Sequence, residues 1–166
     1  MRLTLSDGST LEADLVVSAI GLKPRTELAA QAGAELARGV KVNRELATSV
    51  PHVHALGDCA EVEGLLLPYV MPLMQQARAL AATLAGKPTP VSYPAMPVVV
   101  KTPACPTVVC PPAMGAEGEW QVTETDEALE ARFVSASQPE QMLGFVLQGK
   151  ATAQRQAWAA QTPAVL

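Results

Sequence analysis

Several features that mark particular classes of protein are missing from this sequence of 166 residues. No apolar run approaches the roughly 18 residues that a membrane-spanning helix needs. The opening MRLTLSDGST has neither the apolar core nor the cleavage site of a signal peptide. The twelve basic residues are scattered, so no basic face is available for the phosphates of a nucleic acid. We therefore expect a cytoplasmic protein that binds neither a membrane nor a nucleic acid.

Cysteine and histidine are also scarce. The three cysteines, in a sequence without an export signal, favour reduced thiols over a disulfide framework. Cys105 and Cys110 have the spacing of a redox dithiol, but residues five apart on a strand face opposite sides, which argues against a disulfide. His52 and His54 fall on one face of an expected strand without the further ligands that a metal site needs. We expect no metal ion.

Proline and charge divide the sequence into two parts. Eight of the fourteen prolines lie within 88–112, and such a cluster forces extended or turning backbone. No carboxylate occurs within 64–116, whereas six follow within 117–130. These changes predict a domain boundary near residues 86–90.

The first part has the alternation of strands and helices typical of an α/β fold. Asp7 and Gly8 predict a hairpin turn, and the apolar run 14–19 predicts a strand buried on both faces of a parallel sheet. The other expected elements are a short helix over 26–32, strands over 40–42 and 53–56, and an amphipathic helix over 72–85.

The second part is expected to be a small α+β domain with an antiparallel sheet, because short connections join its strands and a helix follows them. The strands are predicted over 98–101, 107–110, 120–123, 131–135 and 143–148, and the helix over 151–160.

Two stretches carry the chemical signals. DLVVSAIGLKP, from Asp14 to Pro24, ends an apolar strand in a glycine turn, and TSVPHVHALGD, from Thr48 to Asp58, ends a strand in a glycine and a carboxylate. Ligands of open α/β sheets lie beyond the carboxyl ends of the strands. There Gly57 permits close approach, and Asp58 can accept hydrogen bonds from a polyol. The pattern predicts a site for a sugar-like chain.

In this order, the two stretches resemble the second dinucleotide junction and the flavin-binding Gly-Asp of the two-dinucleotide flavoprotein reductases. The continuations GDCAEVEGLLLPYVMPLMQQARALAATLAGKP and MPVVVKTPACPTVVCPP are similar to the rubredoxin-NAD(+) reductases, within the FAD- and NAD(P)-dependent pyridine nucleotide-disulfide oxidoreductase superfamily. The resemblance covers essentially the whole chain. It implies a partial FAD/NAD(P)-binding three-layer α/β fold followed by a small α+β C-terminal domain with an antiparallel sheet.

The resemblance also implies the cofactors and the reaction. FAD takes hydride from NADH and passes single electrons to the iron of rubredoxin, so the cofactor carries the redox chemistry and we assign no catalytic side chain. By position, Asp58 and Gly57 would bind the ribityl hydroxyls of FAD. Ala19 and Gly21 would line the passage between the nicotinamide and flavin domains.

The helix that starts near Pro72 would, by the same resemblance, aim its first amides at the pyrimidine edge of the flavin. A helix N-terminus favours an anion by about 0.3 to 1 kcal/mol. Tyr69, Val70 and Met71 would then be flavin neighbours. Lys101 would lie near the flavin or the acceptor surface, with a solvated lysine at a strand end as the equal alternative.

The sequence departs from the family in one respect, since neither glycine-rich G-x-G-x-x-G loop is present. Those loops seat the pyrophosphates of FAD and NAD. The resemblance then implies a remnant of the NAD-binding domain over 1–21, the second segment of the FAD-binding domain over 22–88, and a C-terminal domain over 89–166. We expect a cloned fragment, a truncated gene or one of two complementing chains, with catalysis only in a complete protein.

Two alternatives stay open at this point. One is a reductase of a different acceptor, such as a ferredoxin or a nitrite-reductase system, because the two dinucleotide stretches are widely shared. The other is a non-catalytic interaction module formed by residues 89–166. The narrower signal VKTPACP favours rubredoxin.

Overall fold

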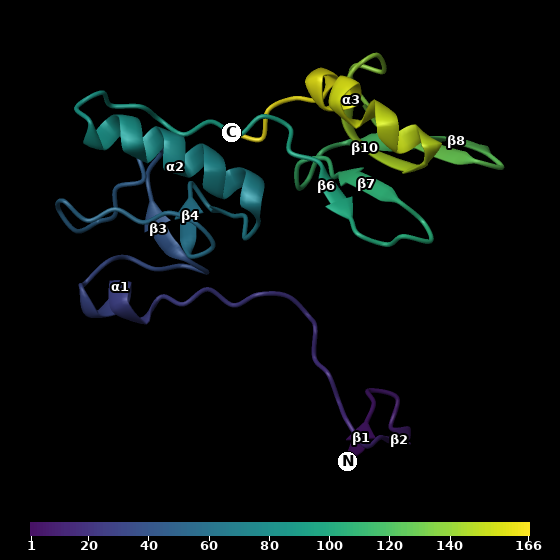
Figure 1. Cartoon of the computed structure of the whole chain (residues 1–166), viewed down its shortest axis with the longest axis horizontal. Helices are drawn as coiled ribbons and strands as arrows, with labels where there is room; N and C mark the ends of the chain where they lie inside the picture. The colour runs from purple at the N-terminus through teal and green to yellow at the C-terminus, as the bar shows by residue number, and fades with distance from the viewer.

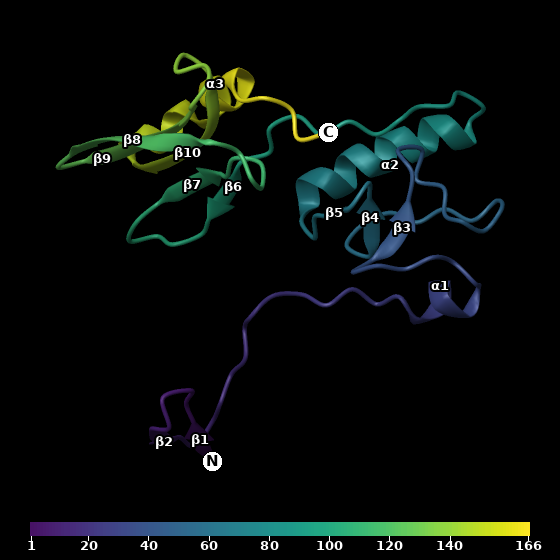
Figure 2. The same cartoon turned by 180° about the vertical axis from the view of Figure 1, so that it is seen from behind.

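A computed structural model describes residues 1–166. Figure 1 shows an N-terminal hairpin, an α/β unit and a unit built around an antiparallel sheet. An extended segment joins the hairpin to the rest, and the C-terminus lies between the other two units in both views (Figures 1 and 2). None of the helices has the length and apolarity needed to cross a membrane.

The N-terminal hairpin pairs β1 (Arg2–Thr4) with β2 (Thr10–Glu12), as predicted. Gly8 has a φ of +84°, which favours glycine at this turn. The Asp7 carboxylate accepts hydrogen bonds from the Ser9 hydroxyl and the Ser9 backbone N–H, and these bonds lower the pKa of Asp7. These bonds and Gly8 shape the turn, and the strand pairing and the Arg2–Glu12 ion pair complete the hairpin.

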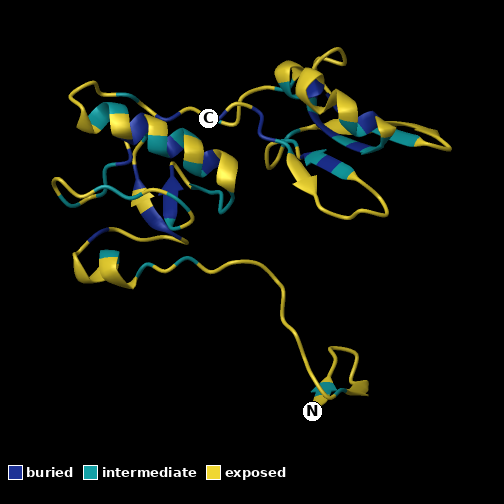
Figure 3. Ribbon diagram, viewed as in Figure 1, coloured by how far each residue is buried: buried dark blue, intermediate teal, exposed yellow.

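The apolar segment after the hairpin is not a strand. Residues 14–19 have no regular secondary structure, and the side chains of Leu15 and Val17 are 76% and 77% exposed (Figure 3). A strand buried on both faces needs paired strands beside it and a packed layer on each face. Residues 1–166 supply neither to this segment, so the prediction of a buried strand over 14–19 is wrong.

The α/β unit has a small sheet beneath one long helix. β3 (Val40–Val42) pairs in parallel with β4 (Ala60–Val62), and β4 pairs antiparallel with β5 (Leu65–Leu66). α1 (Glu27–Gln31) precedes this sheet, and α2 (Val70–Leu84) lies across it (Figure 1). The two helices and β3 confirm the predicted α/β alternation.

α2 begins two residues before its predicted start. Pro72 lies in its first turn, where the missing amide has no partner to lose. The helix ends before Gly86, whose φ of +88° gives the chain a left-handed exit.

The strand predicted over 53–56 is wrong. A single bridge between Ala47 and His54 is the only pairing there. Pro51 precedes a turn in which His52 has a φ of +65°, so the backbone bends where an extended strand was expected. His52 and His54 therefore do not share a strand face.

The core of the α/β unit lies between α2 and the sheet. Val91, Tyr93 and Met96, which precede the C-terminal unit, also belong to it. Nine buried side chains form this core: Val42, Leu46, Ala60, Val62, Ala79, Leu80, Val91, Tyr93 and Met96.

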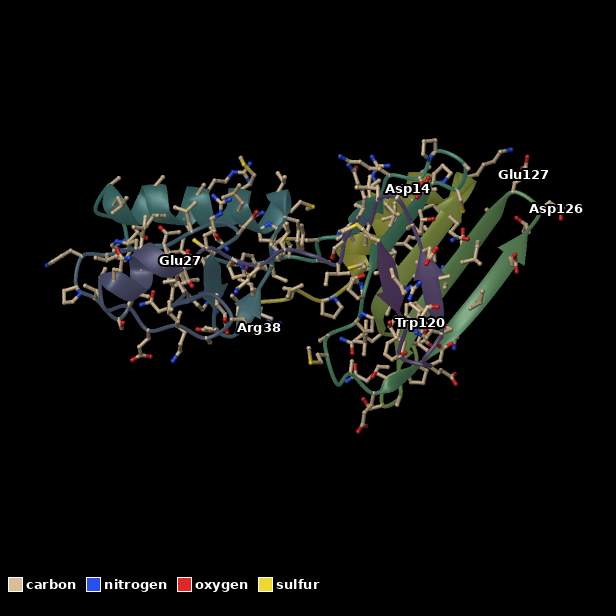
Figure 4. All side chains as sticks on the ribbon, turned by 90° about the horizontal axis from the view of Figure 1, so that it is seen from below. Asp14, Glu27, Arg38, Trp120, Asp126 and Glu127 are labelled. Atoms are coloured by element: carbon tan, nitrogen blue, oxygen red, sulfur yellow. The ribbon has the colours of Figure 1, made fainter.

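The C-terminal unit is the predicted α+β arrangement with an antiparallel sheet. The strand order is β6-β7-β10-β9-β8, and η1 (Lys150–Gln154) and α3 (Arg155–Gln161) follow the last strand. The strands are β6 (Val98–Val100), β7 (Thr107–Cys110), β8 (Gly118–Thr125), β9 (Ala128–Ser135) and β10 (Met142–Gly149). In Figure 4, Asp126 and Glu127 lie together at the tip of the β8–β9 hairpin, far from Trp120.

A second core holds α3 against this sheet. Phe145 and Leu147 of β10 are completely buried. The Phe145 ring meets Trp158 of α3 edge to face, with 5.6 Å between centroids. The Arg132 guanidinium lies 4.6 Å from the centroid of the same tryptophan. Aromatic contacts of this kind fix the helix on the sheet.

Leu147→Ala tests this second core. We expect it to lower the free energy of unfolding by about 2 to 5 kcal/mol, because it removes a fully buried side chain and leaves a cavity. Met114→Ala is the control: Met114 is fully exposed, so its loss should change stability by less than about 0.5 kcal/mol. Urea unfolding followed by circular dichroism gives both values, and equal values would contradict the packing described.

Candidate functional site

The turn at Gly57 and Asp58 leads into β4 and lies against α2. Gly57 has a φ of +85°, and a Cβ built on it would lie 3.3 Å from Cδ1 of Leu73. Glycine is therefore favoured twice, by the left-handed backbone and by the close approach of the helix. The conformation of Gly57 and its contact with α2 hold the turn in place, and Asp58 follows at the end of the turn.

Asp58 presents a free carboxylate to a cavity. It is exposed and takes part in none of the three salt bridges of the chain. The cavity has a volume of about 490 Å³ and is lined by Leu22, Lys23, Pro24, Arg25, Asp58, Cys59, Leu66, Pro68 and Leu73. An ionised carboxylate only accepts hydrogen bonds, so Asp58 suits a ligand that carries hydroxyl groups.

The N-terminus of α2 lies close to the same cavity, because Leu73 in its first turn lines it. Tyr69 is the N-cap and makes no side-chain capping bond, and no acidic residue stands in the first turn. The amides of Val70 and Met71 have no acceptor within the helix. The helix end therefore offers hydrogen-bond donors and a partial positive charge.

Tyr69 lies where the α/β unit approaches the C-terminal unit. Burial raises the pKa of its phenol, and the neighbouring Cys110 and Tyr93 add to the rise. Since Cys110 belongs to β7, the predicted flavin neighbour Tyr69 is close to both units.

The structure does not bring all the predicted site residues together. Ala19 and Gly21 lie in the exposed extended segment, where Gly21 has a φ of +116°. Lys101 is exposed immediately after β6. None of these three lines the cavity beside Asp58. Gly57, Tyr69, Val70 and Met71 do not line it either, so Asp58 is the one predicted site residue in its lining.

Two basic residues of the cavity were not singled out from the sequence. Lys23 and Arg25 flank Pro24, at the end of the first dinucleotide stretch. The signal that points to them is this position, but a basic pair beside a proline is common in loops. Their charges next to the Asp58 carboxylate make the cavity suited to a ligand that has both hydroxyl and anionic groups.

Gln76 of α2 was also missed. Its side chain is buried, and its Oε1 accepts a hydrogen bond from the Gly57 N–H at 2.5 Å. Its Nε2 donates to the Tyr93 hydroxyl at 2.7 Å. The signal that could have identified it is a glutamine within the apolar stripe of α2.

The cysteines and histidines form no further site. All three cysteines are free: Cys59 is half-buried, Cys105 is exposed and Cys110 is buried. No group of three or more His, Cys, Asp or Glu side chains is placed to hold a metal ion.

Two family models match the chain. Residues 1–83 match the pyridine nucleotide-disulphide oxidoreductases, and residues 90–162 match the rubredoxin binding C-terminal domain.

Curated relatives are similar over nearly the whole chain. The rubredoxin-NAD(+) reductase of Alcanivorax borkumensis is 52% identical over 98% of the chain, and that of Acinetobacter baylyi is 50% identical over 93%. The nitric oxide reductase FlRd-NAD(+) reductase of Aeromonas salmonicida is 45% identical over 89%. The chain spans 42%, 38% and 38% of the lengths of these relatives.

Solved structures agree with the fold. A ferredoxin reductase from Rhodopseudomonas palustris has a TM-score of 0.80 and 28% identity, covering 98% of this chain and 42% of that one. A putidaredoxin reductase, solved in covalent complex with putidaredoxin, has a TM-score of 0.75 and 25% identity, covering 95% of this chain and 39% of that one.

The reactivity of the thiols follows from their burial. Burial raises the pKa of Cys110, so less thiolate is present at a given pH, and the folded sheet also blocks access. We expect iodoacetamide at pH 8 to alkylate exposed Cys105 quickly and Cys110 only after unfolding. Mass spectrometry of peptides sampled over time gives the order, and equal rates for the two cysteines in the folded chain would contradict the placement of β7.

Proposed function

This chain belongs to the pyridine nucleotide-disulphide oxidoreductase family, and we propose that it is the C-terminal, flavin-contacting part of a reductase that passes electrons from NADH through FAD to rubredoxin. The observation that carries the proposal is the free carboxylate of Asp58, which lines a cavity beside the N-terminus of α2. We propose the division into an NAD-domain remnant over 1–21, an FAD-domain segment over 22–88 and a C-terminal domain over 89–166.

The groups around the cavity fit part of FAD. Asp58 would accept hydrogen bonds from the ribityl hydroxyls, with Gly57 allowing the close approach. Lys23 and Arg25 would neutralise phosphate oxygens at the same cavity. When bound, the flavin accepts hydride from NADH and releases electrons one at a time.

The N-terminus of α2 would stabilise the reduced form of that flavin. The amides at Val70 and Met71, next to Tyr69, would face the pyrimidine edge, where negative charge develops on reduction. Ala19 and Gly21 would line the passage to the nicotinamide. We place Lys101 near the flavin or the acceptor surface.

Rubredoxin is the proposed electron acceptor. Residues 90–162 match a domain described as rubredoxin binding, and two relatives at 50% identity or more are named rubredoxin-NAD(+) reductases. We propose that the reaction takes place in the cytoplasm, where NADH is generated.

A chimera tests the acceptor. This chain would replace the matched 42% of the Alcanivorax borkumensis relative, whose remaining part supplies the other segments. We expect the purified chimera to bind FAD and to reduce rubredoxin with NADH faster than it reduces a ferredoxin. Stopped-flow absorbance measures both rates, with the unmodified relative as the control. A preference for ferredoxin would contradict the acceptor proposed.

Asp58→Ala in the same chimera tests the flavin site. Loss of a hydrogen bond to a charged group costs about 1.5 to 3 kcal/mol, so the dissociation constant of FAD should rise about tenfold to a hundredfold. Asp126→Ala is the matched control, because Asp126 is exposed at the tip of the β8–β9 hairpin (Figure 4). Fluorescence titration with FAD gives both constants. Equal constants would show that Asp58 does not bind the ribityl chain.

A further inference from the structure

Gln76 is a buried polar side chain in the apolar contact between α2 and the α/β core. It is 1% exposed, and Ala79 and Leu80 of the same helix are buried with it. Both ends of its amide are paired, with Gly57 on one side and Tyr93 on the other. A buried amide placed this way joins three segments that are far apart in the sequence.

The contact to Gly57 bears directly on the Asp58 carboxylate. Gly57 immediately precedes Asp58, and its N–H points at a side chain of α2 instead of a backbone carbonyl. Leu73, one turn earlier on the helix, packs against the same glycine. α2 therefore holds the Leu56–Gly57 peptide, directly before Asp58.

Tyr93 completes the pairing of the Gln76 amide, whose orientation is fixed by the Gly57 N–H. The Gly57 N–H is only a donor, so it needs the oxygen of the amide, and the nitrogen must then find an acceptor. The Tyr93 hydroxyl is that acceptor, and its ring is completely buried. The backbone of Tyr93 is itself held, because its N–H donates to the Leu166 carbonyl and its carbonyl accepts from Val165.

We propose that Gln76 is the positioning residue of the flavin-binding turn, and that Tyr93, where the chain enters the C-terminal unit, holds the Gln76 amide in place by accepting a hydrogen bond from its nitrogen. This inference rests on the proposed function for the flavin, but the geometry that it describes can be measured without flavin. Gln76 acts through Gly57 and Asp58, and we assign it no contact with the cofactor.

The amide of Gly57 is the direct probe in the 166-residue chain. Selective labelling with ¹⁵N-glycine gives one signal for each of the eleven glycines. We expect Gln76→Met, which keeps the side-chain length but removes the amide, to speed hydrogen exchange at Gly57 by about tenfold. Gly86, whose N–H bonds to the Thr83 carbonyl at the end of α2, is the internal control and should not change.

Three further variants separate positioning from simple packing. Gln75→Met, at the adjacent and half-buried glutamine, should leave Gly57 exchange unchanged. Gln76→Glu keeps an acceptor for the Gly57 N–H and should restore its protection. Tyr93→Phe removes one hydroxyl and should speed exchange at Gly57 in the natural background, but not when Gln76→Met is already present.

These outcomes decide the geometric part of the inference. Three results together support it. Exchange at Gly57 is slower in the natural chain than in Gln76→Met, Gln76→Glu restores the protection, and Tyr93→Phe has no further effect once Gln76→Met is present. Unchanged Gly57 exchange in Gln76→Met, or an effect of Tyr93→Phe that is the same in both backgrounds, would overturn it. If Gln76→Met fails to fold, Tyr93→Phe still tests the contact, because it removes only the hydroxyl group of the ring.

The flavin part is measured in the chimera. We expect Gln76→Met to raise the dissociation constant of FAD by about tenfold, but to add nothing in an Asp58→Ala background. Full additivity of the two changes would overturn the positioning role. If Asp58→Ala alone has no effect, the proposed flavin site fails, whereas the exchange of Gly57 still reports on the Gln76 contact.

Discussion

A buried amide that loses a partner costs about 1 to 3 kcal/mol, and Gln76 avoids that cost only while Gly57 and Tyr93 both stay in place. The α/β unit is arranged around this requirement. α2 supplies the amide, the turn before β4 supplies the N–H, and residues 91–96 supply the hydroxyl and complete the core. The free carboxylate of Asp58 stands next to this link. The stability of the unit and the geometry of its cavity thus depend on the same side chain.

Local signals explain what could be predicted of the fold. Asp7 and Gly8 mark the turn of the hairpin, and Pro72 and Gly86 mark the two ends of α2. In the C-terminal unit, short connections join successive antiparallel strands. A strand over 14–19 would instead need neighbouring strands to pair with, and the sequence of the segment itself does not determine whether those neighbours are present. β5 was missed because two residues are too short for a periodic pattern, and β4 was missed because the strand of this region was expected over 53–56 instead.

The candidate site divides in the same way. Asp58 was proposed from its motif, because a glycine followed by a carboxylate is a pattern of neighbouring residues, although the strand expected before the pair is absent and the pair leads into β4 instead. Gln76 lies nineteen positions from Gly57, and only the packing of α2 on the turn brings the two together. Lys23 and Arg25 face the cavity because the chain folds back toward Asp58. These are tertiary contacts, and a local sequence pattern does not predict them.

We propose that this half of the site forms a complete flavin site together with segments that carry the two glycine-rich loops, which are absent from this sequence. The most direct measurement is a crystal structure of the chimera with bound FAD. The account predicts an Asp58 carboxylate oxygen within hydrogen-bonding distance of a ribityl hydroxyl, with the Gly57 N–H still bonded to Gln76. A ribityl chain bound away from Asp58 would contradict it.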